Sequence, residues 1–195
     1  GGRVPSGGGV DGRIRAARDA GLAVHLDGAR LWNAAVAAGV PPARLAHGVD
    51  TVMVSISKGL GCPVGSCLGL RKEQRARARE IRKRLGGGMR QSGIVAAAGL
   101  FALDHNLDPI AQVHANAKRF AEVLSDSPTV QPSDPDSNIV MVDLESDAQP
   151  ASARLAQAGV LMSAYGPKRV RAVMHLDVSR ADVERAARIL LDTLR

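Results

Sequence analysis

The stretch LAVHLDGARLWNAAVAAG (Leu22–Gly39), continued by TVMVSISKGLG (Thr51–Gly61), decides the fold. Its first apolar run, Leu22–Asp27, predicts a buried strand, and Ala29–Gly39 predicts a helix that glycine ends. A second apolar run, Thr51–Ser57, predicts another buried strand. Strand, helix and strand in this order form a βαβ unit, in which the two strands are parallel and the crossover is right-handed.

Further elements follow from the same kinds of pattern. The segment GSCLGL (65–70) is compatible with a strand, RKEQRARAREIRKRL (71–85) with a basic helix, and IVAAAGLFALDHN (94–106) with an apolar helix. Beyond Asp108 the pattern changes. We expect helices at 110–124, 151–157 and from Arg180, and strands at 138–144, around Val160 and in VRAVMHL (170–176). The sequence thus predicts an α/β domain with a mostly parallel sheet over 1–108, followed by a small α+β domain over 109–195.

Composition narrows the class of protein. With 45% hydrophobic residues among 195, the chain can bury a core, but only 2% are aromatic, so this core is built from Ala, Val, Leu and Ile. No apolar run reaches the length of a membrane span, and no signal peptide opens the chain, so we expect a cytoplasmic protein. Cys62 and Cys67 are too few for a disulfide framework or a zinc site, and we expect two buried thiols.

The net charge of +7 is concentrated in one segment, since Arg71–Leu85 holds eight Lys/Arg and two Glu. A basic helix of this kind presents a charged face to solvent, binds an anion, or binds nucleic acid along a strip of positive charge. The scarcity of aromatic side chains argues against the last of these, so a basic nucleic-acid-binding module is only a distant alternative.

Two charged residues are expected to share one edge of the predicted sheet. Asp27 ends the first predicted strand and Lys58 ends the second, and ligands of open α/β sheets bind at the carboxyl ends of the strands. Glycines surround the lysine in SISKGLGCPVG (55–65) and are expected to leave room beside the amine for a ligand. A structural salt bridge is the alternative; we prefer a ligand site in which the lysine attacks a carbonyl.

Four separated blocks now carry a resemblance: HLDGARLWNAAVAAGV (25–40), VSISKGLGCPVGS (54–66), RKRLGGGMRQSGIVAAAGLFAL (82–103) and VRAVMHLDVS (170–179). In this order they resemble the low-specificity L-threonine aldolases, in the β-eliminating lyase group of the fold type I pyridoxal-phosphate enzymes. The resemblance implies the fold type I (PLP-dependent transferase-like) architecture and pyridoxal 5'-phosphate as cofactor.

The resemblance also implies a role for several residues. Lys58 matches the lysine that holds pyridoxal phosphate as a Schiff base, and Asp27 matches the carboxylate that pairs with the pyridine nitrogen. Arg30 matches an arginine against the cofactor ring. Lys83 and Arg90 match basic positions that reach the cofactor phosphate, across a subunit interface. Arg171 matches the arginine that binds the substrate carboxylate; no metal is implied.

For His25 and His175, which lie in the same motifs, we expect hydrogen-bonded structural roles at buried positions.

The implied reaction is a retro-aldol cleavage. A β-hydroxy-α-amino acid such as L-threonine or L-allo-threonine would give glycine and acetaldehyde. The resemblance further implies a homo-oligomer, a tetramer built from dimers, with no nucleic-acid or membrane partner. Another pyridoxal-phosphate lyase, either β-eliminating or similar to serine hydroxymethyltransferase, is the nearer alternative.

The start of the chain, GGRV, resembles a stretch well inside the family's large domain. We therefore expect an N-terminally truncated fragment that lacks the family's phosphate loop and ring-stacking histidine. Such a fragment would bind pyridoxal phosphate weakly and turn over threonine slowly. The glycine-rich PSGGGVDG (5–12) lies where relatives begin a helix, and glycine weakens helices.

Overall fold

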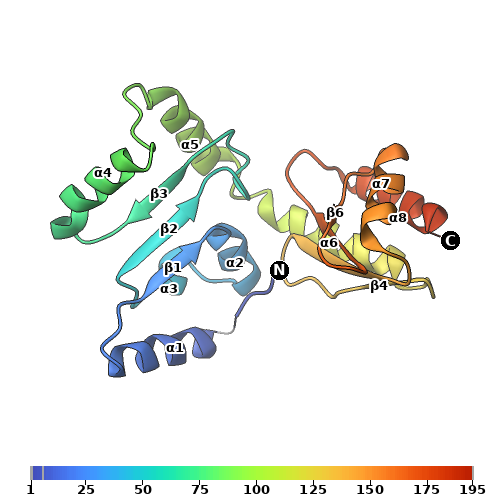
Figure 1. Ribbon diagram of the computed structural model, residues 1–195, viewed down its shortest axis with the longest axis horizontal. Helices are drawn as coiled ribbons and strands as arrows, with labels where there is room; N and C mark the ends of the chain where they lie inside the picture. Colours follow the sequence, from blue (N-terminus) through green and yellow to red (C-terminus); the bar gives the residue numbers. More distant parts are fainter. Residues whose placement is uncertain (1, 6, 195) are drawn as a thin grey trace. The chain divides into compact units, whose positions relative to one another are not determined.

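The computed structural model describes residues 2–5 and 7–194. The chain forms two compact units, Pro5–Asp108 and Pro109–Arg195 together with Gly1–Val4. Each unit has its own sheet (Figure 1). No helix among the described residues is both long enough and apolar enough to cross a membrane.

The Pro5–Asp108 unit is built on a three-stranded mixed sheet in the order β1-β2-β3. The parallel pair is β1 (His25–Gly28) and β2 (Thr51–Ser55), with α2 (Leu31–Ala38) and α3 (Pro42–Leu45) between them, as the βαβ prediction requires. β3 (Ser66–Gly69) pairs antiparallel with β2. The remaining elements of this unit are α1 (Gly7–Asp19), the 3-10 helix η1 (Lys72–Gln74), α4 (Arg75–Arg84) and α5 (Gly93–His105).

The two predicted strands are shorter and less buried than expected. β1 begins at His25 rather than Leu22, and Leu22 is largely exposed. β2 ends at Ser55 rather than Ser57. The His25 and Asp27 side chains point to the same face of β1, and both are exposed.

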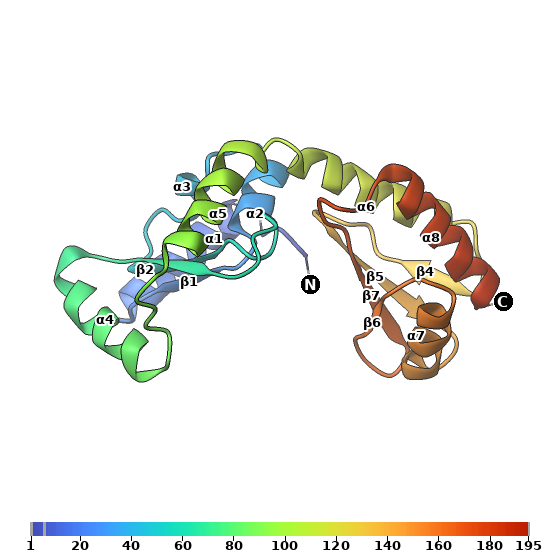
Figure 2. The ribbon, with the colours of Figure 1, turned by 90° about the horizontal axis from the view of Figure 1, so that it is seen from above.

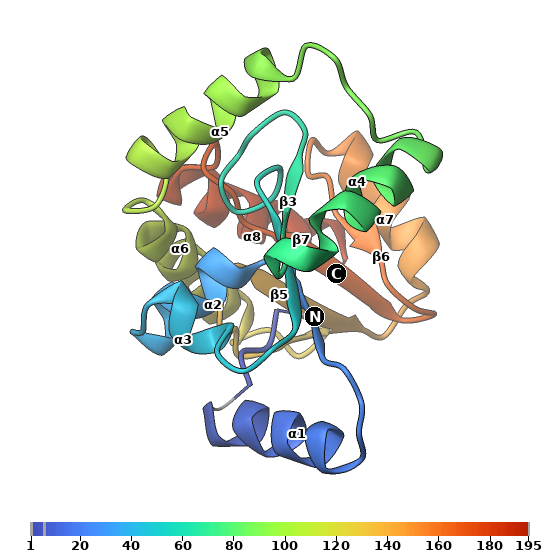
Figure 3. The same ribbon diagram turned by 90° about the vertical axis from the view of Figure 1, so that its left-hand side faces the viewer.

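The glycine-rich N-terminal segment does form a helix, α1, despite the low helix propensity of glycine. Contacts to α3 and to the loop after it hold α1 in place. Asp11 accepts two hydrogen bonds from the Arg44 guanidinium, at 2.7 and 3.2 Å, and Arg18 donates to the Gly48 carbonyl at 2.8 Å. Figures 1 and 3 show α1 on the β1 side of the sheet, away from α4. Tertiary contacts therefore compensate for the weak local preference.

The second unit contains an antiparallel four-stranded sheet in the order β4-β5-β7-β6. Its strands are β4 (Val130–Pro132), β5 (Ile139–Leu144), β6 (Ser163–Ala164) and β7 (Arg169–Val173). The helices α6 (Ile110–Leu124), α7 (Ala148–Gln157) and α8 (Arg180–Thr193) supply the other half of the core. Figure 2 shows α6 and α8 on one side of this sheet.

Alternation along the strands separates a core face from an open face in this sheet. Val140 and Val142 of β5, and Val170 and Ala172 of β7, are buried in the core with the helices. The intervening residues of β7 point to the other face, because successive side chains of a strand alternate. The other face carries Arg169 and Arg171 of β7 beside Met141 and Asp143 of β5.

Sequence patterns located most elements of this unit. The predicted helix 110–124 is confirmed by α6, and the predicted start of the last helix by α8. α7 begins three residues before the predicted 151, and the short strand expected around Val160 lies instead at Ser163–Ala164.

Candidate functional site

The parallel pair brings two of the predicted site residues to one edge. Asp27 lies opposite Met53, and Gly28 lies opposite Val54, so β1 and β2 end at the same edge of the sheet. Lys58 is three residues past the end of β2, in the loop that leads to β3, rather than at the strand end itself. The carboxyl edge therefore carries both Asp27 and Lys58.

Asp27 is exposed and has one oxygen engaged. Its Oδ1 accepts a hydrogen bond from the Ala29 backbone N–H at 3.0 Å, which fixes the carboxylate at the turn into α2. Within the described part of the chain, Asp27 forms no ion pair with Lys58. The salt-bridge alternative is therefore not realised, and Oδ2 remains available to a hydrogen-bond donor.

The loop that bears Lys58 is held by backbone hydrogen bonds at its base. Ile56 N–H donates to the Gly65 carbonyl at 3.1 Å, and Cys62 N–H donates to the Ile56 carbonyl at 3.0 Å. Within the loop, Gly61 N–H donates to the Lys58 carbonyl at 3.0 Å, and Gly61 adopts a left-handed φ of 71°. The amine of Lys58 is thus presented, exposed, from an ordered turn.

Buried contacts anchor the same loop to the helices. Leu60 is fully buried, and its carbonyl accepts a hydrogen bond at 2.8 Å from the Asn106 side chain, just after α5. The Cys62 thiol donates to the Ala98 carbonyl on α5 at 3.4 Å. These contacts fix the backbone of Leu60 and Cys62, which follow Lys58 in the loop.

Gly59, directly after Lys58, and Gly65 do not leave the space for a ligand that the sequence predicted. A Cβ at Gly59 would lie 2.2 Å from Oδ1 of Asn33, and a Cβ at Gly65 would lie 2.8 Å from Cδ1 of Ile56. These two glycines therefore admit neighbouring side chains of the protein itself, and the expectation that they leave room for a ligand is wrong for both.

Asn33 is a site residue that sequence reasoning missed. It lies on α2, one turn after Arg30, and is only 2% exposed. An amide in an otherwise apolar helix was the available signal, because a buried polar side chain has to be satisfied by neighbouring groups. Its contact with Gly59 joins α2 to the Lys58 loop.

Arg30 occupies the N-cap position of α2, directly after β1. Its side chain is partly buried. The turn from β1 to α2 thus places Arg30 and Asp27 at the same end of the strand.

Lys83 and Arg90 lie in a separate part of the unit. Lys83 is in the last turn of α4, and Arg90 is in the connection to α5; both are exposed. Within the described residues, neither forms a hydrogen bond or an ion pair with Asp27 or Lys58. Some charges of α4 are neutralised locally, since Glu80 pairs with Arg77 at 2.8 Å and with Arg84 at 2.5 Å.

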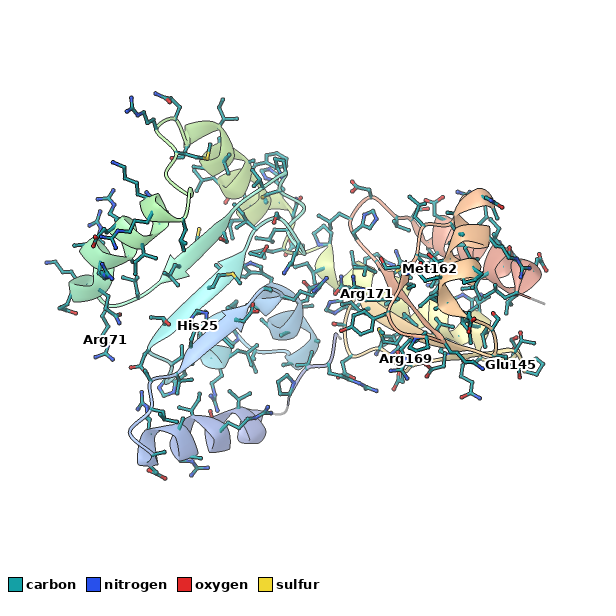
Figure 4. The ribbon with its side chains drawn as sticks, in the orientation of Figure 1. His25, Arg71, Glu145, Met162, Arg169 and Arg171 are labelled. Atoms are coloured by element: carbon teal, nitrogen blue, oxygen red, sulfur yellow. The ribbon has the colours of Figure 1, made fainter. Side chains whose placement is uncertain are left out.

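Arg171 belongs to the second unit, on the open face of its sheet. It lies on β7 between Met141 of β5 and Ser163 of β6 (Figure 4). Its guanidinium carbon lies 5.2 Å from the centre of the Tyr165 ring. Its Nε is buried and has no hydrogen-bond acceptor among the described residues. A partly buried cation of this kind is suited to binding an anion.

Three sequence expectations about other side chains need correction. His25 is exposed, although Nδ1 is 2.7 Å from the Thr51 hydroxyl, and His175 is also exposed, with Nδ1 3.3 Å from the Asp177 carboxylate. Both are hydrogen-bonded or paired as expected, but neither is buried. Cys62 is buried, whereas Cys67 lies on β3, whose four residues are all exposed.

Comparison with known proteins defines the class first. The structure superimposes on a threonine aldolase from Leishmania major with a TM-score of 0.75, at 17% identity, over 97% of this chain and 57% of that one. It superimposes on LysN, the α-aminoadipate aminotransferase of Thermus thermophilus, solved with N-(5'-phosphopyridoxyl)-L-leucine, with a TM-score of 0.69 at 17% identity over 96% and 54%. The fold is therefore fold type I of the pyridoxal-phosphate enzymes, as predicted.

The family is defined by sequence. The model of the beta-eliminating lyase family matches residues 1–147, and the chain belongs to this family. The low specificity L-threonine aldolase of Escherichia coli strain K12 is 40% identical over 171 residues, which are 87% of this chain and 50% of that protein. The chain spans about half the length of the curated relatives it matches.

Proposed function

We propose that this chain carries part of the active site of a threonine aldolase that uses pyridoxal 5'-phosphate. The reaction would be the cleavage of L-threonine or L-allo-threonine to glycine and acetaldehyde. The observation that carries this proposal is the placement of Asp27 and Lys58 at one carboxyl edge, in a chain of the beta-eliminating lyase family.

The residues at this edge fit the cofactor chemically. Lys58 offers an exposed amine on an ordered loop, which is the group that would hold the cofactor aldehyde. Asp27 keeps one carboxylate oxygen for the pyridine nitrogen, since the other accepts from Ala29. When bound, pyridoxal phosphate supplies an electron sink for the carbanion left by carbon–carbon cleavage. Arg30 would lie beside the ring.

Lys83 and Arg90 are proposed as phosphate-binding residues. Their exposure and their separation from Asp27 and Lys58 suit a role at a site formed with another copy of the chain. We accordingly propose a homo-oligomer built from dimers, functioning in the cytoplasm in threonine breakdown and glycine formation.

Arg171 is proposed to bind the carboxylate of the amino acid. Its guanidinium has no carboxylate partner within the described residues, and a planar guanidinium binds a carboxylate through two parallel hydrogen bonds. Such binding would orient the bond to be broken, which is a large part of the catalytic effect in reactions of this type.

Borohydride trapping tests the assignment of Lys58. The chain is incubated with pyridoxal phosphate, reduced, and digested for mass spectrometry, which detects even weakly held cofactor at the lysine that binds it. We expect the adduct on Lys58, at several times the level on the exposed Lys72, together with a visible absorption band before reduction. Labelling no greater on Lys58 than on Lys72, or a band that persists in folded Lys58→Ala, would overturn the proposal.

A product assay separates this reaction from that of related lyases. With threonine as substrate the aldolase reaction releases acetaldehyde, whereas β-elimination from other amino acids releases pyruvate and ammonia. We expect acetaldehyde, at a low rate, because the chain spans about half the length of its relatives. Release of pyruvate and ammonia from serine, with no acetaldehyde from threonine, would favour the alternative.

A further inference from the structure

Two arginines on β7 point to the open face of the second sheet but differ in their partners (Figure 4). Arg169 donates to both oxygens of Asp143 on β5, at 2.5 and 2.8 Å, in a bidentate pair. Arg171, two residues along the same strand, has no carboxylate partner within the described residues, although β5 supplies Met141 opposite it. The sheet thus neutralises one guanidinium and leaves its neighbour unpaired.

One nitrogen of the Arg171 guanidinium is shielded from water without a hydrogen-bond acceptor among the described residues. Nε of Arg171 is buried and has no acceptor in the part of the chain that the structure describes. A buried N–H without an acceptor is costly, and a folded protein that retains one calls for an explanation. The outer nitrogens are the atoms through which an anion would be bound.

Tyr165 is the side chain that holds this guanidinium. It follows β6, and its backbone N–H donates to the Arg169 carbonyl at 2.7 Å, which fixes the backbone beside β7. The Tyr165 ring then lies with its centre 5.2 Å from the Arg171 guanidinium carbon. A ring at this distance attracts the cation through its negative face.

We propose that Tyr165 is a positioning residue for the amino acid carboxylate. The Arg171 guanidinium carbon lies over this ring, and the attraction between them would hold the outer nitrogens in place for two parallel hydrogen bonds to a carboxylate. The proposal rests on the carboxylate-binding role proposed for Arg171, and it assigns the effect to the ring rather than to the hydroxyl.

The ring assignment predicts opposite results for two substitutions. Tyr165→Phe keeps the aromatic face and retains carboxylate binding at Arg171. Tyr165→Leu keeps a shorter apolar side chain but removes the aromatic face, and weakens carboxylate binding by roughly fivefold. Tyr165 is 53% exposed, so neither change empties a core position.

Nuclear magnetic resonance of the arginine side chains tests this on the full chain. The chain is labelled with 15N-arginine, and the Nε–H signal of Arg171 is assigned by its loss in Arg171→Lys. Sodium acetate is the carboxylate probe, with sodium chloride at matched ionic strength as the salt control. Leu161→Ser, which changes an exposed side chain of the same unit, is the matched control variant.

We expect the Arg171 signal to move saturably with acetate in the parent chain, in Tyr165→Phe and in Leu161→Ser, and to respond roughly fivefold more weakly in Tyr165→Leu. Backbone amide spectra check that each variant is folded. An equal response in Tyr165→Leu, or an equally weak one in Tyr165→Phe, overturns the role of the Tyr165 ring while Arg171 keeps its own. No response to acetate in the parent chain overturns both.

Discussion

Gly59 lies next to the proposed cofactor lysine, and the space beside its Cα is filled by the Asn33 side chain. Since a Cβ would lie 2.2 Å from Asn33 Oδ1, the two residues are interdependent. The position of the Lys58 loop is therefore set partly by α2, which lies before β2 in the sequence.

Substitution of this glycine should be destabilising for a steric reason. We expect Gly59→Ala to lower the free energy of unfolding by about 1–3 kcal/mol, as overpacking does in other cores. In the Asn33→Ala background the additional cost should fall, because the clashing atom is gone. Urea unfolding followed by the fluorescence of Trp32 measures both values.

Gly12→Ala is the control for this prediction, because a Cβ there meets nothing within 4 Å in α1. It should stabilise the helix by about 0.5–1 kcal/mol. Equal effects of Gly59→Ala in both backgrounds would contradict the proposed coupling.

The two cysteines should differ in reactivity. Burial raises the pKa of the Cys62 thiol, which also donates to the Ala98 carbonyl, whereas Cys67 is exposed on β3. Because the thiolate is the reactive form, we expect one rapid equivalent with a disulfide reagent at pH 8 and a second only in denaturant. Cys67→Ser should abolish the rapid phase and Cys62→Ser should retain it. Two rapid equivalents in the folded chain would contradict this assignment.

At the scale of elements, the apolar pattern of α6 predicts the bounds of the helix but not the protonation of the histidine on its buried face. Its apolar period predicts Ile110–Leu124 correctly, yet the buried face also contains His114. Burial, and secondarily the charge of Lys118, lowers the pKa of His114. The packing around His114, together with Lys118 one turn along the helix, decides this shift.

The stability of the second unit should therefore depend on pH. The unfolded chain takes up a proton on His114 near its ordinary pKa of about 6.5, whereas the folded chain resists it to lower pH. Stability is thus full above about pH 6.5 and falls as the pH is lowered through the folded pKa. Urea midpoints from pH 7.5 to 5, followed by Tyr165 fluorescence in a Trp32→Phe background, measure this slope.

His114→Leu should flatten the dependence on pH, whereas His175→Asn, a change at an exposed position, should leave it in place. A slope that is unchanged in His114→Leu would show that other groups cause it.

At the scale of the whole molecule, the two units differ in how well their cores are closed. Among the described residues, 22 buried hydrophobic side chains belong to the second unit and seven to Pro5–Asp108. The Pro5–Asp108 unit also exposes large apolar side chains on and beside α5, among them Ile94 at 85%, Leu100 and Phe101. Exposed apolar surface of this kind marks a region of interaction.

This difference predicts two separate unfolding transitions. The chain has one tryptophan, Trp32, in the Pro5–Asp108 unit and one tyrosine, Tyr165, in the other, so each unit has its own fluorescent probe. We expect Trp32 to report a urea midpoint lower by about 1 M than that of Tyr165 in Trp32→Phe, since buried apolar area sets the stability. Coincident midpoints would mean that the units unfold together.

The sequence by itself determined the βαβ order and the shared carboxyl edge of Asp27 and Lys58, because strand and helix periods and their short connections are local properties. It also carried the four blocks from which the fold type and the family were recognised. Only the tertiary structure decided that Asn33 fills the space beside Gly59. It also decided that Arg169 pairs with Asp143, whereas Arg171 lies over the Tyr165 ring. These choices depend on strand register and on contacts between residues distant in the chain, which no local pattern encodes.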